Sequence, residues 1–176
     1  MELNLIKIAI VGPESTGKST ISEQLADHYQ TVWVPEYARG YCEKLTAPCT
    51  WQDEINMFRG QLELEEKMAR SAKRILICDT TFITVKIWSD FMFGSAPQEV
   101  LDKLAHHPYD LYLLMNIDLP WQEDPLRDFP DKREYFMEVW HTELKALNAN
   151  YSLISGSDED RLQNAIQCID SFMIDK

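Results

Sequence analysis

Short apolar runs alternate with longer segments of helical periodicity along this chain. Five runs predict strands, and residues 5–11 (LIKIAIV) are apolar enough for a strand that is buried on both faces of a sheet. The other predicted strands are residues 31–34, 74–79, 110–116 and 151–155. Helices are predicted at residues 18–29, 51–73, 80–93, 98–107 and 132–147, with a last helix from Ser157 onward. In the long second helix, one approximate apolar face contains Ile55, Phe58, Leu62 and Met68.

Strands that alternate with helices indicate an α/β fold with a parallel sheet and right-handed crossovers. No internal repeat, low-complexity tract or Gly/Ser linker interrupts the pattern, so residues 1–176 are expected to form one domain. Ligands of such sheets bind beyond the carboxyl ends of the strands. A glycine-rich turn, Glu36 and Asp79 follow the first three predicted strands, so we expect them to converge on one site.

The turn after the first strand has the pattern of a phosphate-binding loop. Residues 12–19 (GPESTGKS) contain two glycines separated by four residues and followed by Lys and Ser. The glycines let backbone N–H groups point at a phosphate, and the next helix directs its positive end toward the anion. Lys18 is expected to contact phosphate and Ser19 to bind Mg²⁺, so ATP and Mg²⁺ are the predicted cofactors. The nucleotide-binding residues predicted here are Gly12, Glu14, Ser15, Thr16, Gly17, Lys18, Ser19 and Thr20.

Two acidic residues are candidates for catalysis. Asp79 ends the segment RILICD, where a carboxylate beside a phosphate-binding loop can hold Mg²⁺, although Asp is also a favoured helix cap. Glu36 lies in VPEYAR, where a carboxylate can take the proton of an acceptor hydroxyl. An acid on the first turn of a helix is also favoured by the helix dipole. The spacing leaves open which of the two carboxylates is the base.

Arginine and aromatic residues add further candidates. Arg127, with Arg133 second, is the leading candidate for an arginine on a closing flap at roughly residues 119–134; the alternative is a solvated loop with local Arg–Asp pairs. Arg39 can pair with Glu36 or contact phosphate. Some large aromatic residues are candidates either for stacking on a flat or cationic ring or for the core. The aromatic candidates for substrate binding are Tyr37, Tyr41, Trp88 and Trp121, alongside Glu36, Arg39 and Asp79.

Composition narrows the classes of partner. The chain has 17 Lys and Arg against 29 Asp and Glu, and the net charge of −12 disfavours nucleic acid and anionic membranes. The four cysteines lack the spacing of zinc or redox motifs, so we expect reduced, buried thiols. Residues 1–4 lack the basic opening of a signal peptide, and no apolar run approaches the roughly 20 residues that span a bilayer. We therefore expect a cytoplasmic protein.

Five segments together resemble the kinase domain of NadR-type ribosylnicotinamide kinases. They are GPESTGKST, VPEYAR, ICDT, YDLYLLMNIDLPW with DPLRD, and LISGSDEDRLQNA, in the family's order over nearly the whole chain. The resemblance implies a three-layer P-loop kinase fold with a five-stranded parallel sheet and an arginine-bearing lid. It also implies ATP-dependent phosphorylation of the 5′-hydroxyl of nicotinamide riboside to nicotinamide mononucleotide, in NAD salvage. Glu36 and Asp79 would then face substrate and metal, Arg127 would lie in the lid, and Gly156 would lie near the adenine.

The resemblance has departures, and it leaves alternatives open. Thr81 stands where relatives often have an acid, and Gly40 where they often have Glu. From the length of 176 residues, we expect neither the adenylyltransferase nor the DNA-binding domain of longer NadR proteins. The alternatives are a kinase for another nucleoside or a thiamine-like vitamin, and a regulatory ATPase without a small-molecule acceptor. GTP in place of ATP and a homo-oligomeric state also stay open, and the acidic balance is compatible with a cationic acceptor.

Overall fold

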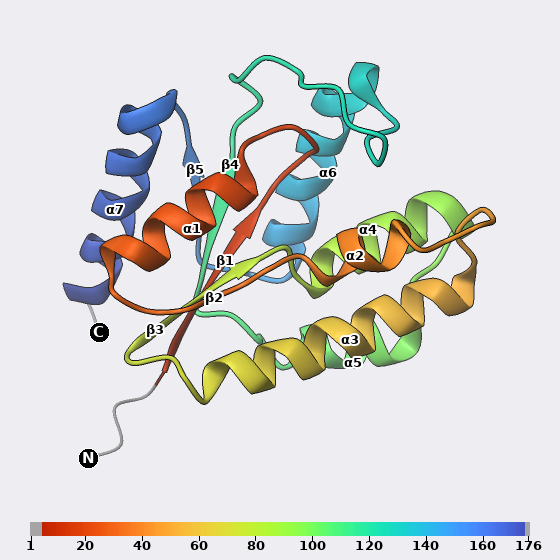
Figure 1. Ribbon diagram of the computed structural model, residues 1–176, viewed down its shortest axis with the longest axis horizontal. Coiled ribbons are helices and arrows are strands. Elements are labelled where there is room, and N and C mark those ends of the chain that lie inside the picture. Colours follow the sequence, from red (N-terminus) through yellow and green to blue (C-terminus); the bar gives the residue numbers. More distant parts are fainter. Residues whose placement is uncertain (1–4, 175–176) are drawn as a thin grey trace.

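A five-stranded parallel sheet forms the centre of the molecule (Figure 1). In this computed structural model, residues 5–174 are described, so the expectation about a signal peptide at residues 1–4 lies outside them. The strand order is β2-β3-β1-β4-β5, and every pairing is parallel, which confirms the predicted α/β fold. The strands are β1 (Ile6–Val11), β2 (Trp33–Val34), β3 (Ile75–Asp79), β4 (Leu111–Met115) and β5 (Tyr151–Ile154).

The six predicted helices are present with small shifts at their ends, and the structure adds a short helix, α2 (Tyr37–Cys42), that was not among them. The others are α1 (Lys18–His28), α3 (Trp51–Ala69), α4 (Phe82–Phe93), α5 (Gln98–Ala105), α6 (Arg133–Ala146) and α7 (Asp158–Ile174), with a short 3₁₀ helix η1 (Pro130–Lys132) before α6. The helix predicted from residue 80 begins at Phe82, because Thr80 has a left-handed φ of 68° that a helix cannot contain. Within residues 5–174, no helix is long and apolar enough to cross a membrane.

Two apolar layers cover the two faces of the sheet and produce the predicted three-layer architecture. Alternate side chains of β1 point to opposite faces. Ile8 and Ile10 pack with α1 and α7, whereas Ala9 and Val11 belong to the cluster formed with α3, α4, α5 and α6. Figure 1 shows these two groups of helices on opposite sides of the strands. The continuous apolar run of β1 follows from this double burial.

The cysteines are free thiols, as predicted, but their burial differs from the prediction. Cys78 lies in β3 and is fully buried, whereas Cys42, Cys49 and Cys168 are only partly buried. The reason is their position: only Cys78 is on a strand covered on both faces, whereas the other three lie on helices or in a loop. Cys42 and Cys49 border the cavity described next.

Candidate active site

A cavity of about 710 Å³ opens where β1 and β3 end, bordered by the loop after β1. Its walls come from residues 12–21, from α2 and α3, from α4, and from residues 119–129. The start of α7 closes one part of it through Ser157, Asp158 and Arg161. The position beyond the carboxyl ends of the strands is the one that the sequence predicts for a ligand.

The glycines of the phosphate-binding loop are required by its geometry. Gly12 has a φ of 138°, and a Cβ atom there would lie 2.9 Å from the backbone oxygen of Met115. Gly17 has a φ of 77° and caps α1, so its conformation also favours glycine. The loop therefore presents its backbone to the cavity, as anion binding requires.

Lys18 folds back over this loop. Its Nζ atom donates hydrogen bonds to the carbonyl oxygens of Gly12 at 3.0 Å and Pro13 at 2.7 Å. Burial lowers the pKa of the Lys18 ammonium below its usual value, while the negative charges of Glu36 and Asp79 oppose that shift. The one positive charge of the loop is thus already placed at the edge of the cavity.

Ser19 and Asp79 meet directly. The Ser19 hydroxyl donates to Asp79 Oδ2 at 2.6 Å, and Asp79 is only 1% exposed. Its other oxygen, Oδ1, has no hydrogen-bond partner in the described part of the chain, and burial raises the pKa of the carboxyl to about 6. The Ser19 hydroxyl and the Asp79 carboxylate, one of whose oxygens has no partner, form a donor set that fits Mg²⁺. Residues 5–174 contain no cluster of three His, Cys, Asp or Glu suited to a metal.

Glu36 and Arg39 lie where α2 begins and border the same cavity. Glu36 is the residue before α2, and its negative charge acts on both Lys18 and Asp79. Arg39 pairs neither with Glu36 nor with the phosphate-binding loop. Its Nη1 atom lies 3.0 Å from Asp124 Oδ2, so Arg39 connects α2 to the segment that the sequence predicts as a lid.

The segment that is predicted to form a lid, residues 119–134, is hydrogen-bonded to the phosphate-binding loop. Gln122 N donates to Ser15 Oγ at 2.8 Å, and Arg133 donates to Ser15 O at 3.1 Å and to Leu119 O at 2.9 Å. Arg127 lines the cavity but donates to Gln122 O at 2.6 Å, within the lid itself. The structure therefore separates the two arginines: Arg133 joins the predicted lid segment to the loop, and Arg127 of the same segment lines the cavity.

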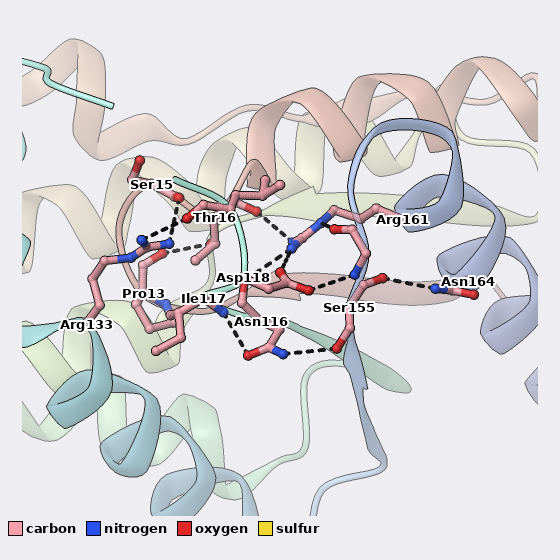
Figure 2. A network of polar contacts seen from close by, with 12 residues as sticks. Pro13, Ser15, Thr16, Asn116, Ile117, Asp118, Arg133, Ser155, Arg161 and Asn164 are labelled. Carbon is pink, nitrogen blue, oxygen red and sulfur yellow. Dashed lines mark hydrogen bonds and ion pairs between the residues drawn. The ribbon is translucent and has the colours of Figure 1, made fainter. Parts of the chain in front are cut away.

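A buried arginine that the sequence does not single out ties together three loops (Figure 2). Arg161 donates to Thr16 O at 3.0 Å and to Gly156 O at 2.7 Å, and its guanidinium is paired with Asp118. Asp118 in turn accepts a hydrogen bond from Gly156 N at 2.7 Å. Gly156, with a φ of 102°, does not border the cavity itself, but it shapes the turn whose next residues do.

The aromatic candidates have different environments. Trp88 borders the cavity and packs on Phe129 of the lid, with ring centroids 5.7 Å apart. Tyr37 and Tyr41 share a helix face, as their spacing indicates, but neither borders the cavity. Tyr37 covers Gly60 of α3, and the Tyr41 hydroxyl donates to Asp53 at 2.7 Å. The opposite face of α2, with Ala38, Arg39 and Cys42, is the one that borders the cavity. Trp121 is likewise absent from the cavity walls.

The two positions that depart from the family pattern have different surroundings. Thr81 is fully buried before α4 and borders the cavity, and its hydroxyl has no hydrogen-bond partner within residues 5–174. A Cβ atom on Gly40 would meet no atom within 4 Å, so this position has space for a larger side chain. Only the departure at Thr81 therefore changes the lining of the cavity.

Comparisons with known proteins agree with this arrangement. The profile of a family described as "AAA domain" matches residues 7–161. The trifunctional NAD biosynthesis/regulator protein NadR of Salmonella typhimurium is 25% identical over 175 residues, covering 94% of this chain and 42% of that protein. NadR of Escherichia coli is 24% identical, covering 93% of this chain and 41% of its own length. This chain thus spans less than half the length of the curated relatives it matches.

Solved structures give the same result for the fold. A NadR protein in complex with NR superposes with a TM-score of 0.78 at 20% identity, covering 95% of this chain and 50% of that one. Thymidylate kinase from Ehrlichia chaffeensis superposes with a TM-score of 0.66 at 16% identity, covering 95% and 98% of the two chains. The P-loop kinase fold and the similarity to NadR proteins that the motifs predict are both confirmed.

Proposed function

The chain belongs to the AAA domain family, and from this premise we propose that it is an ATP-dependent kinase that phosphorylates the 5′-hydroxyl of nicotinamide riboside. The product would be nicotinamide mononucleotide, a step of NAD salvage. The observation that carries the proposal is one cavity that is lined both by the phosphate-binding loop and by residues of α2, α3 and α4. A phosphotransferase needs space for an acceptor next to the nucleotide, whereas a regulatory ATPase needs only the nucleotide site. The similarity to NadR proteins favours this acceptor over other nucleosides.

In this proposal, residues 12–20 hold the phosphates of ATP. Lys18 exchanges its two carbonyl partners for phosphate oxygens, and the backbone N–H groups of the loop complete the cradle. Ser19 and Asp79 would hold Mg²⁺, whose charge offsets that of the β- and γ-phosphates. The turn at Gly156, held by Arg161, would border the adenine.

Glu36 is the better candidate for the base. The Oδ2 atom of Asp79 already accepts the Ser19 hydroxyl, which fits a metal-binding role for Asp79. Glu36 borders the cavity at the start of α2, where it would accept the proton of the acceptor hydroxyl. The hydroxyl oxygen then forms the bond to the γ-phosphorus while the bond to the ADP oxygen breaks. Arg127, a residue of the lid that lines the cavity, would offset the charge that develops on the transferred group.

The test is a search for the phosphorylated product. Protein, Mg·ATP and nicotinamide riboside are mixed, alongside a panel of other nucleosides and thiamine, and mass spectrometry detects any compound that gains one phosphoryl group. We expect nicotinamide mononucleotide, with one ADP released per product. Phosphorylation of a different acceptor would replace the substrate in this proposal. ADP release that requires no acceptor would contradict a kinase and favour the regulatory ATPase.

A further inference from the structure

We propose that Glu54 and Gln61 of α3 form a subsite that recognises a carboxamide on a cationic ring, and that this subsite selects nicotinamide riboside over its carboxylate and uncharged analogues. The inference rests on the proposed function and assigns the acceptor specificity of the same cavity. Both residues border the cavity, and both are buried, with 5% and 3% of their surface exposed. They are seven residues apart, so two helical turns place them on one face of α3, with Met57 between them.

Gln61 presents an unpaired donor. The backbone N–H of Tyr37 donates to Gln61 Oε1 at 2.9 Å, which fixes the orientation of the side-chain amide. Its Nε2 atom is buried and has no hydrogen-bond partner among residues 5–174. Leaving a buried donor without a partner is unfavourable, so this position favours a ligand that brings an acceptor oxygen. The carbonyl oxygen of a carboxamide is such an acceptor.

Glu54 presents a buried carboxyl that no cation of the described chain neutralises. The groups that face it are the thiols of Cys49 and Cys42 and the neighbouring carboxylate of Asp53. The Cys49 thiol is 3.7 Å from Glu54 Oε1, a weak contact for an acid in this position. Burial raises the pKa of Glu54 to about 7, as expected where no positive charge stabilises the carboxylate. A cationic ligand would provide that charge.

Glu65, on the same helix, shows what a structural buried acid looks like in this protein. Its side chain is fully buried, but it accepts a hydrogen bond from the Tyr109 hydroxyl and lies 3.4 Å from Lys7 Nζ. Glu65 does not border the cavity, whereas Glu54 does. The two buried acids therefore differ in their partners: the Glu65 carboxylate has partners within the fold, whereas Glu54 borders the cavity without a cation.

The pair matches one class of ligand. A carboxamide offers an oxygen to the donor of Gln61 and an N–H group to the carboxylate of Glu54, and a pyridinium ring adds the missing positive charge. A carboxylate in place of the carboxamide would bring a second negative charge toward Glu54, which is unfavourable at low solvent exposure. An uncharged ring would lose the ionic part of the attraction but keep both hydrogen bonds.

Three acceptors separate these contributions: nicotinamide riboside, its uncharged dihydro form, and nicotinic acid riboside with a carboxylate. We expect the wild type to rank them in that order of kcat/KM at pH 8. In Glu54→Gln, kcat/KM for nicotinamide riboside should fall about 10–100-fold, as loss of a charged hydrogen bond implies. The value for the dihydro form should change less than about threefold, the value for the carboxylate analogue should rise, and the KM for ATP should stay the same.

Glu63→Gln is the matched control, because Glu63 is an exposed acid on the same helix. This variant should leave kcat/KM unchanged for all three acceptors. Gln61→Leu should lower kcat/KM for both carboxamide acceptors, and thermal unfolding of each variant confirms that it is folded. An equal loss for all three acceptors in Glu54→Gln, or no loss, would overturn the subsite while leaving the kinase assignment intact. If the wild type phosphorylates none of the three acceptors, the proposed function is overturned, and the subsite with it.

Discussion

Lys18 carries the positive charge that the phosphate-binding loop itself provides. Its ammonium is held by Gly12 O and Pro13 O, so the loop keeps its shape around a group that can turn toward phosphate. We expect Lys18→Ala to lower kcat/KM for ATP by about 10²–10³-fold, the usual cost of one charge-stabilising group. Coupled detection of ADP measures this loss. Circular dichroism should show an intact fold, and an unchanged turnover would contradict nucleotide binding at this loop.

Glu54 predicts a pH dependence of stability. The carboxyl ionises near its usual pKa of 4.5 in the unfolded chain but near 7 in the folded one. The unfolded state therefore loses its proton first, and the stability of the fold falls as pH rises from about 4.5 to 7 and then levels off. Integration over that window gives an upper limit of about 3 kcal/mol.

Glu54→Gln removes this dependence. Urea unfolding at pH 5 and pH 8 should show that the variant gains stability relative to the wild type at the higher pH. Glu63→Gln, on the exposed side of α3, should follow the wild type at both values. If the wild type and Glu54→Gln change in parallel with pH, Glu54 does not carry a raised pKa in the folded state.

At the scale of elements, two arginines of the predicted lid have different hydrogen-bond partners. Arg133→Ala removes hydrogen bonds to Ser15 O and Leu119 O, so the lid and the phosphate-binding loop should separate more easily. We expect the KM for ATP to rise about tenfold with a smaller change in kcat. Arg127→Ala leaves those bonds in place and should lower kcat by about 10²-fold or more if Arg127 acts on the transferred group. Steady-state kinetics with varied ATP separates the two effects, and identical profiles would contradict the division of roles.

Helix α3 is joined to the sheet by a polar contact inside the core. The Tyr109 hydroxyl donates to Glu65, whose other partner is Lys7 of β1. Tyr109→Phe removes one of the two partners of a buried carboxyl and should lower the free energy of unfolding by about 1–3 kcal/mol. Urea unfolding at pH 7 measures it. Activity at saturating substrates should stay near that of the wild type, because neither Tyr109 nor Glu65 borders the cavity.

A strand or loop could be predicted from the sequence where a single continuous stretch of residues determines it. The run of β1 is apolar because both faces of the strand are covered, and the phosphate-binding loop is contiguous in sequence. The face of α3 was harder to predict, because its buried positions include Glu54, Gln61 and Glu65, which an amphipathic pattern assigns to solvent. The pairing of Arg161 with Asp118 leaves no local signal either, since the two residues are 43 positions apart and meet only because β4 and β5 are neighbours.

At the scale of the whole molecule, the layers and the lid enclose one cavity, so ligands should stabilise the entire fold. Saturating Mg·ATP at about 100 times its Kd would add about 2.7 kcal/mol, or roughly 5–10 °C in Tm for a domain of this size. Thermal unfolding with and without Mg·ATP measures this shift. Asp79→Asn should lose the part of the shift that depends on Mg²⁺, and Lys18→Ala should lose most of it. An Asp79→Asn variant whose shift still depends on Mg²⁺ would contradict the metal role of Asp79.

The anchoring of α2 has a consequence for how ATP is protected from water. Glu36 follows β2, a strand of only two residues, and precedes a six-residue helix without a buried side chain. Contacts on two sides steady this helix: Tyr37 N and the Tyr41 hydroxyl donate to Gln61 and Asp53 of α3, and Arg39 pairs with Asp124 of the predicted lid. In the proposed mechanism, opening of the lid would break the pair between Arg39 and Asp124 while the contacts with α3 remain, so the helix that follows Glu36 would be held on one side only. If Glu36 is the base, the proton acceptor would be fully held only while the site is closed to bulk water, which would limit idle hydrolysis of ATP.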